Sequence, residues 1–258
     1  GFLAQPLLAL SQRLGRPPMI DYASTVLYNW ARIDPFGPIS MTNIRCVLRV
    51  TGLLDEEWFF KTHVIIESEA AHAVSALLAA SQADDDGELL QHLVSLEEAL
   101  WRVVRACLPI MYECSDDGMP KCNAHIFYQI LRPIIKSGPL VFEGGEVPRE
   151  IALTGPSGAM SSLLPCIDAV LGIQTTSAKS REALAGFEHS MPQKHRCLIA
   201  DLRGRKSLRQ RIRLARGVGA ACSEHADVLI GAYNRCIARV LDFRWQHWQY
   251  VKHFIMKP

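Results

Sequence analysis

The sequence predicts an all-α protein, and three long stretches carry that prediction. Residues 55–82, 88–112 and 224–257 each place apolar side chains three and four positions apart, which is the spacing of one face of an α-helix. The strand-like stretch 44–52 alternates only imperfectly. A chain of 258 residues is also long enough to bury a sizeable core. We therefore expect a large, predominantly helical domain.

The first fifty residues contain short elements separated by turns. Residues 1–16 have leucines at helical spacing, and Pro17 and Pro18 stop that helix. A short helix should then end near Trp30, before the turn-rich linker 34–40.

The first two long helices should follow one another. Asp55 and Glu56 suit the positive end of the helix 55–82, and the acids and glycine of 83–87 should form a solvated stop. The apolar stripe of 88–112 should belong to the core.

A shorter helix over 124–136 is interrupted by Pro133. Proline removes a backbone donor and disfavours helical geometry at the residue before it, which is Arg132. We therefore expect a kink that gives the Arg132 side chain a particular direction.

Two Gly- and Pro-rich segments, 137–148 and 153–162, occupy the middle of the chain. The second opens a helix, so its backbone donors at 157–161 should face a helix N-terminus and suit an anion. Neither segment has the GxxxxGK[ST] or GxGxxG pattern of a nucleotide loop.

Composition excludes several classes of function. The net charge of +2 gives no electrostatic argument for nucleic acid, and the basic run 203–216 should be a solvated surface. Eight cysteines without a CxxC pair favour free thiols in a reducing cytoplasm over a zinc ribbon or a disulfide framework. No apolar run approaches the roughly 20 residues that span a bilayer, so we expect no membrane partner.

The last helix carries two non-apolar residues, Arg244 and His247, on its inward face. One interpretation is a core histidine with its hydrogen bonds satisfied, beside an arginine that extends its charge to solvent. The other is a metal or cofactor ligand with a cationic neighbour.

Four segments carry a resemblance that favours the second interpretation. They read VFEGG (141–145), GPSGAMSSLLPCIDAVLGIQ (155–174), HSMPQKHR (189–196) and RWQHWQYVKHFIMKP (244–258). They resemble the indoleamine 2,3-dioxygenase family, from about Leu10 to Pro258. The resemblance implies a large helical haem-binding domain at 51–258, with residues 1–50 the remnant of a small N-terminal helical domain and its linker.

The resemblance also implies a cofactor, haem b, and the residues that hold it. His247 matches the axial ligand of the haem iron, and Arg244 matches an arginine that pairs with a propionate. Ser157 would bond a propionate or the bound ligand, although Pro156 stands where the family often has a second glycine. Asp168 would pair with Arg244 or be structural.

Further matches place a substrate pocket above the haem. Phe59 and Phe127 match phenylalanines that pack on the substrate, and Arg132 matches the arginine that binds its carboxylate; a surface ion pair is the alternative for Arg132. Ile135 would line the same pocket. The first segment contributes three more matches that close the pocket: Tyr22, Thr25 and Val26.

His63 departs from the family, which commonly has serine there. It resembles the related tryptophan 2,3-dioxygenases, where a distal histidine can accept a hydrogen bond from the indole N–H. A distal histidine also occurs in related haem enzymes that hydroxylate or otherwise oxidise aromatic amino acids. A structural role for His63 is the remaining alternative.

The implied reaction is cleavage of the indole C2–C3 bond of L-tryptophan, or of a related indole, by dioxygen to an N-formylkynurenine-type product. His63, Phe127, Arg132 and Ser157 would be the residues that act on the reactants. Two alternatives stay open. One is haem-dependent oxidation or hydroxylation of another aromatic amino acid or indole in a biosynthetic pathway, and the other is a non-catalytic haem-binding sensor.

Overall fold

The computed structural model describes residues 2–136, 138–142, 149–151, 155–217 and 224–256. Within these ranges the protein is all-α, as predicted. The described strands form two small antiparallel ladders. In one, β1 (Trp30–Arg32) pairs with β2 (Ile44–Cys46), and Trp30 lies opposite Cys46. In the other, β3 (Leu140–Phe142) pairs with β4 (Arg149–Ile151).

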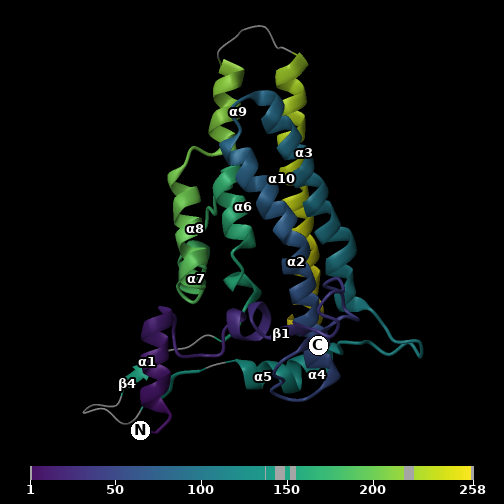
Figure 1. The fold of residues 1–258 in the computed structure, drawn as a ribbon, viewed down its shortest axis with the longest axis vertical. Coiled ribbons are helices and arrows are strands. Elements are labelled where there is room, and N and C mark those ends of the chain that lie inside the picture. Colours follow the sequence, from purple (N-terminus) through teal and green to yellow (C-terminus); the bar gives the residue numbers. More distant parts are fainter. Residues whose placement is uncertain (1, 137, 143–148, 152–154, 218–223, 257–258) are drawn as a thin grey trace.

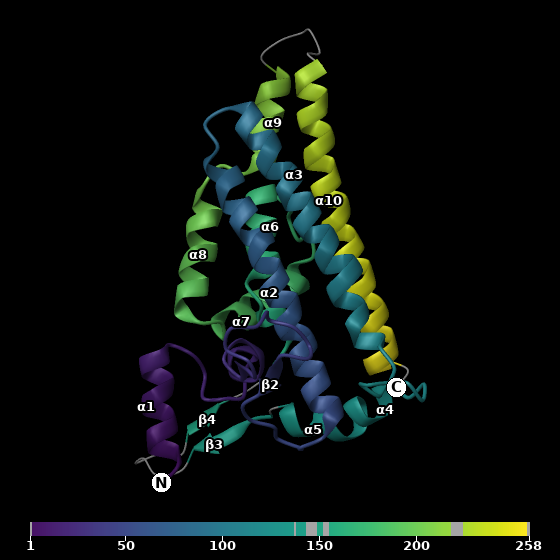
Figure 2. The same cartoon turned by 45° about the vertical axis from the view of Figure 1, so that its right-hand side comes forward.

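Three long helices run side by side along the molecule (Figures 1 and 2). They are α2 (Leu54–Gln82), α3 (Asp86–Arg102) and α10 (Glu224–Val251). The fully buried leucines of α3, Leu89, Leu93 and Leu96, fill the space that it shares with α2 and α10. Because each fully buried leucine contributes about 1.5–3 kcal/mol, this seam is a major source of stability.

A second group of helices covers the other side of α2. It comprises α6 (Leu163–Leu171), α7 (Ala178–His189), α8 (Gln193–Gly204) and α9 (Leu208–Gly217). Helix α6 packs against both α2 and α8 and lies between them in Figure 1. It ends at Gly172, which has a φ of 72°. A Cβ atom at this position would lie only 2.8 Å from Ser207 Oγ, so only glycine fits.

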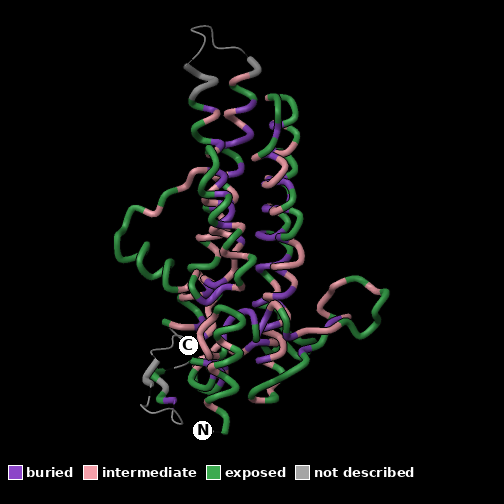
Figure 3. Tube along the Cα trace, turned by 60° about the vertical axis from the view of Figure 1, so that its left-hand side comes forward, coloured by how far each residue is buried: buried purple, intermediate pink, exposed green. Residues whose placement is uncertain are grey.

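The N-terminal segment is mostly at the surface. Helix α1 (Ala4–Leu14) has no buried residue and appears green in Figure 3. The short helix expected before Trp30 is a π-helical turn, η1 (Ala23–Leu27). The division into a small domain of residues 1–50 and a large one of 51–258 stays a prediction.

The strand predicted over 44–52 is wrong beyond Cys46. The Asn29 side chain accepts from Leu48 N at 2.8 Å and donates to Leu48 O at 2.9 Å, which ends the ladder. The Glu56 carboxylate then accepts from the backbone N–H groups of residues 50–52. The segment bends because these two side chains replace strand pairing.

The geometry expected at Arg132 is also wrong. Arg132 is helical, with φ −58° and ψ −44°. The helix predicted over 124–136 is divided into α4 (Ala124–Ile126), the wide π turn η4 (Phe127–Leu131) and α5 (Arg132–Ile135). Pro133 lies in the first turn of α5, where a missing N–H costs little, so the chain continues without a break.

Two other π turns and two short 3₁₀ turns complete the described elements. The π turns are η2 (Val103–Cys107) and η6 (Lys252–Met256), which extend α3 and α10. The 3₁₀ turns are η3 (Leu108–Tyr112) and η5 (Gly158–Met160). The predicted segment 137–148 lies partly outside the described residues.

Two expectations from composition have different outcomes. The seven described cysteines are free thiols, as predicted. Contrary to expectation, α2 is long and apolar enough to cross a membrane by length and composition. It packs against α3, α6 and η1 and carries Glu56 and Glu67, which is the pattern of a central core helix.

Candidate functional site

A cavity of about 1410 Å³ lies between α2, α6, α7 and α10 and reaches down to η1 and η4. Its volume exceeds the roughly 300–1,000 Å³ of an ordinary ligand pocket. All of the residues that the sequence singled out line this one cavity: Tyr22, Thr25, Val26, Phe59, His63, Phe127, Arg132, Ile135, Ser157, Asp168, Arg244 and His247. Residues more than 200 positions apart are therefore brought to one space.

Helix α2 gives the cavity an aromatic wall. Phe59 and His63 are one turn apart, and their ring centroids are 4.5 Å from each other. The Phe59 ring lies 4.7 Å from Phe127 of η4, which in turn meets Phe254 of η6 edge-on at 5.7 Å. The π turns η4 and η6 thus bring two rings to this wall.

The orientation of His63 is set by its own helix. Its Nδ1 lies 2.8 Å from the backbone carbonyl of Phe59. A carbonyl oxygen only accepts, so Nδ1 carries the hydrogen and Nε2 keeps a lone pair. Burial lowers the pKa of His63, which keeps the ring neutral at physiological pH.

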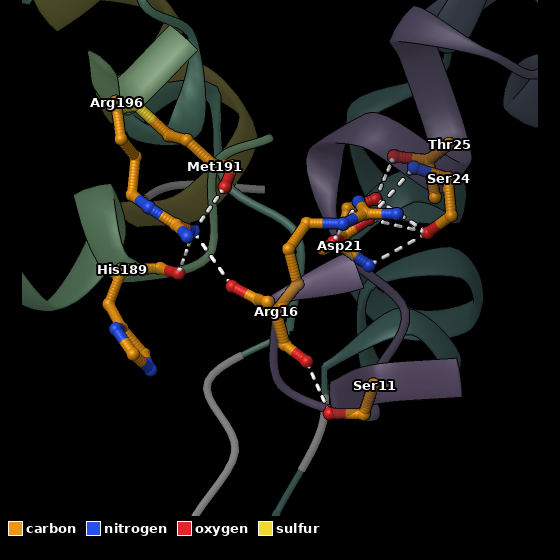
Figure 4. A network of polar contacts seen from close by, with 9 residues as sticks. Ser11, Arg16, Asp21, Ser24, Thr25, His189, Met191 and Arg196 are labelled. Carbon is orange, nitrogen blue, oxygen red and sulfur yellow. Dashed lines mark hydrogen bonds and ion pairs between the residues drawn. The ribbon is translucent and has the colours of Figure 1, made fainter. Parts of the chain in front are cut away.

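The η1 wall presents Tyr22, Thr25 and Val26, all buried. Asp21, just before this wall, is held by Arg16 at 2.5 Å and accepts from the Ser24 backbone N–H at 2.8 Å (Figure 4). The Thr25 hydroxyl donates to the Asp21 carbonyl at 2.9 Å. The buried Asp21 thus holds the start of η1 in place through these bonds.

Arg196 of α8 ties this segment to the helices on the other side. Its Nη1 donates to three backbone carbonyls, those of Gly15, His189 and Met191, at 2.7–3.0 Å. Figure 4 shows the guanidinium between the α7–α8 corner and the chain at Arg16. The η1 wall is therefore anchored at two points outside the cavity.

Arg132 and Ile135 form the base of the cavity on α5. The Arg132 guanidinium lies over the Tyr128 ring, 5.2 Å from its centroid. No described carboxylate lies within ion-pair distance of it, so the surface ion pair considered as the alternative is not found among the described residues. Its charge is available to a ligand.

The α10 wall carries Arg244 and His247. Arg244 Nη2 donates to both oxygens of Asp168, at 2.6 and 2.7 Å, which confirms the predicted pair. Burial raises the pKa of Asp168 and the Arg244 charge opposes that shift.

His247 is exposed to the space of the cavity, and the protein around it lowers its pKa by desolvation. Within the described ranges its ring has no hydrogen-bond partner, and so lacks the acceptor that usually orients the second ring nitrogen of a metal-bound histidine. The neutral ring is free to coordinate through a lone pair.

The segment before α6 fits an anion less well than predicted. The N–H groups of residues 159–161 are bonded within the turn η5, because Ala159 donates to the Ser157 hydroxyl and the next two donate to the carbonyls of Ser157 and Gly158. The predicted backbone donors at these positions are therefore occupied. The Ser157 hydroxyl lines the cavity and keeps its own hydrogen to donate.

Glu67 and Ser161 are among the polar residues of the cavity that sequence reasoning missed. Glu67 follows His63 by one turn on α2, and its carboxylate accepts from Tyr22 Oη at 2.8 Å. The i+4 spacing from His63 was the signal that could have revealed it.

Comparisons with known proteins agree with these observations. A family model described as indoleamine 2,3-dioxygenase matches residues 2–258. Indoleamine 2,3-dioxygenase 1 of Mus musculus is 29% identical over 99% of this chain and 62% of the relative.

Two further relatives carry different names. The 6-hydroxytryptophan 2,3-dioxygenase of Fusarium equiseti is 26% identical over 99% of this chain and 62% of the relative. A myoglobin of Haliotis madaka is 25% identical over 98% of this chain and 64% of the relative. The chain spans about three fifths of the length of these curated relatives.

Proposed function

The chain belongs to the indoleamine 2,3-dioxygenase family, and from this premise we propose that it is a haem-dependent dioxygenase that opens the indole ring of L-tryptophan or a related indole. The observation that carries the proposal is the convergence of all the predicted site residues on one cavity, with His63 and His247 on different walls. We place the reaction in the cytoplasm, where the free thiols stay reduced.

Haem b fits the cavity on three observations. The space of about 1410 Å³ can take a large planar cofactor together with a small aromatic molecule. His247 offers a neutral imidazole without a protein partner in the described part of the chain. Among the described residues no three His, Cys, Asp or Glu side chains gather to hold a bare metal ion, whereas a porphyrin brings its own four nitrogens.

We assign the cofactor-holding roles to three residues. His247 would be the protein ligand of the iron, because it lines the cavity and its ring has no hydrogen-bond partner in the described part of the chain. Arg244, fixed in direction by Asp168, and the Ser157 hydroxyl would bind propionates. Haem bound there would supply the dioxygen-binding and redox chemistry of the reaction.

The aromatic rings would hold the substrate. Phe59 and Phe127 form a tilted pair on one side, and the Tyr22 ring stands edge-on to His63, 6.1 Å away at 78°. With the buried residues Thr25, Val26 and Ile135 they would line a largely apolar pocket for an indole. Such a pocket orients the reacting ring and excludes water.

His63 would accept a hydrogen bond from the indole N–H. Its Nδ1–H is bonded to the Phe59 carbonyl, so Nε2 is the free nitrogen and can only accept in the neutral ring. An indole N–H is a donor without acceptor capacity, which makes the two groups complementary. The serine common in the family is shorter, so this histidine should make substrate choice depend more strongly on an unsubstituted indole nitrogen.

Arg132 would bind the carboxylate of the amino acid. Its guanidinium has no carboxylate partner in the described chain and is steadied by the Tyr128 ring. A planar guanidinium meets a carboxylate with two parallel hydrogen bonds, which adds direction as well as affinity.

The decisive experiment is a product assay with the haem-reconstituted protein. Reduced protein is given L-tryptophan and air, and oxygen uptake and product mass are followed. We expect gain of two oxygen atoms per tryptophan and the absorbance of an N-formylkynurenine-type product.

Two other outcomes would contradict the proposal. Gain of a single oxygen with the ring intact would indicate hydroxylation. Haem and oxygen binding without any product from tryptophan, 6-hydroxytryptophan or tryptamine would indicate a non-catalytic haem protein.

A further inference from the structure

Glu67 is an acid in the cavity wall that the assignments above do not use. Three carboxyl groups line the cavity in the described chain: Glu67, Asp168 and Glu188. Asp168 is paired with Arg244 at 2.6 Å, and Glu188 is paired with Arg203 at 2.9 Å. No described lysine, arginine or histidine nitrogen lies within ion-pair distance of Glu67. A carboxyl left without a cation in such a place requires a reason.

The contacts of Glu67 are two hydroxyl groups. Tyr22 Oη donates to its Oε1 at 2.8 Å, and its second contact is the Ser161 side chain. Burial raises the pKa of Glu67, while the two hydrogen bonds lower it by less. Both hydroxyls donate to the carboxyl group, and the Ser161 oxygen also accepts from Leu163 N at 3.2 Å.

We propose that Glu67 is a positioning residue for the aromatic substrate, and that it acts by fixing the Tyr22 hydroxyl so that the Tyr22 ring stands edge-on to His63. This role rests on the proposed function, because it assumes that an aromatic substrate lies beside Tyr22 and His63.

The geometry explains why the acid stands on α2 rather than on η1. His63 and Glu67 lie one turn apart on the same rigid helix, and Tyr22 contacts both, through its ring and through its hydroxyl. Helix α2 thereby fixes the position of the Tyr22 ring relative to the accepting nitrogen of His63. Asp21 and Arg16 pair with each other at 2.5 Å and do not line the cavity, whereas Glu67 contacts the Tyr22 hydroxyl inside it.

The test is a double-mutant cycle on substrate affinity in the haem-reconstituted protein. Affinity is measured from the change that L-tryptophan causes in the haem absorption spectrum, together with KM and kcat. Glu67→Leu removes both hydrogen bonds and keeps a side chain of similar size. Tyr22→Phe removes only the hydroxyl group. We expect each substitution to weaken tryptophan binding about 2- to 10-fold, mainly by raising KM. The double variant should bind tryptophan no more weakly than the single variant with the lower affinity, because both substitutions remove the same contact.

Two further variants separate positioning from structure. Glu67→Gln keeps a carbonyl oxygen that can accept from Tyr22, so its affinity should be nearly normal. Glu69→Gln is the matched control, because Glu69 lies on the same helix but pairs with Arg102 away from the cavity, so affinity should not change.

Additive effects of Glu67→Leu and Tyr22→Phe, or unchanged affinity in Glu67→Leu, would overturn the inference. If the unaltered protein binds haem but shows no response to any indole, the proposed function itself fails. Circular dichroism and haem absorbance in each variant exclude a simple folding defect.

Discussion

The two histidines of the cavity show how one side chain can be prepared for two different tasks. His63 on α2 has one ring nitrogen bonded to its own helix, which leaves the other as an acceptor of fixed direction. His247 on α10 has no such bond in the described part of the chain, and its ring faces open space. Burial lowers the pKa of both, so both are neutral. The difference between them therefore comes from hydrogen bonding and not from charge.

The largest expected effect tests whether only one of the two histidines holds the cofactor. His247→Ala should weaken haem retention by more than about 100-fold, since loss of residues that merely orient a metal ligand already costs 10- to 100-fold. His63→Ala should retain haem. Haem absorbance after gel filtration measures both, and added imidazole should restore the His247→Ala spectrum. Equal loss of haem from His247→Ala and His63→Ala would contradict the assignment of His247 as the only histidine that holds the cofactor.

The next effect concerns substrate alone. Arg132→Leu should weaken binding of L-tryptophan roughly 10- to 150-fold, because a hydrogen-bonded charge contributes about 1.5–3 kcal/mol. Tryptamine, which has no carboxylate, should bind the variant and the unaltered protein alike. Spectral titration is the measurement, and haem content should not change. If tryptophan and tryptamine lose equal affinity, Arg132 does not bind the carboxylate.

A smaller effect is expected at Ser157. Ser157→Ala removes one hydroxyl that faces the cavity and should reduce haem affinity about 2- to 10-fold, with little change in substrate binding to the haem-loaded protein. Haem transfer to apomyoglobin gives the rate of loss. Ser162→Ala is the control, because Ser162 bonds His195 outside the cavity and should leave that rate unchanged.

The smallest expected effect is on the pH dependence of stability. The pKa of His63 is below 6.5 in the folded protein, so the unfolded chain takes up a proton first as pH falls. The free energy of unfolding of the haem-free protein should therefore decrease as pH drops below about 6.5. His63→Gln should make that decrease smaller, whereas His72→Gln, at an exposed position of the same helix, should not. Urea titrations at several pH values provide the comparison.

Much of the architecture could be predicted from side-chain spacing. The stripe of α10 placed Arg244 and His247 on one inward face, and α2 was expected within one residue of its actual start. The convergence of the site, in contrast, depended on the family resemblance, since spacing alone cannot bring Tyr22 and His247 to one cavity.

The misses have physical causes. Helical geometry at Arg132 could not be predicted, because the π turn before it lets Pro133 sit in a first turn. Residues 47–52 were expected to be a strand, but the side chains of Asn29 and Glu56 form hydrogen bonds with the backbone groups that strand pairing would need. Glu67 was overlooked because an acid on a mostly apolar helix suggests solvent, whereas its partner Tyr22 is 45 residues away.

The wide turn at Phe127–Leu131 has a consequence for how the pocket could change. An i→i+5 turn contains one residue more than an α-helical turn, so losing a residue there would restore the regular helix. Because the wide turn absorbs that residue locally, the helix on either side would keep its register, and Phe127 and Arg132 would keep their directions. The same deletion in a regular helix would rotate every later residue by about 100°, so the wide turn marks a place where this wall can change length and still present its arginine.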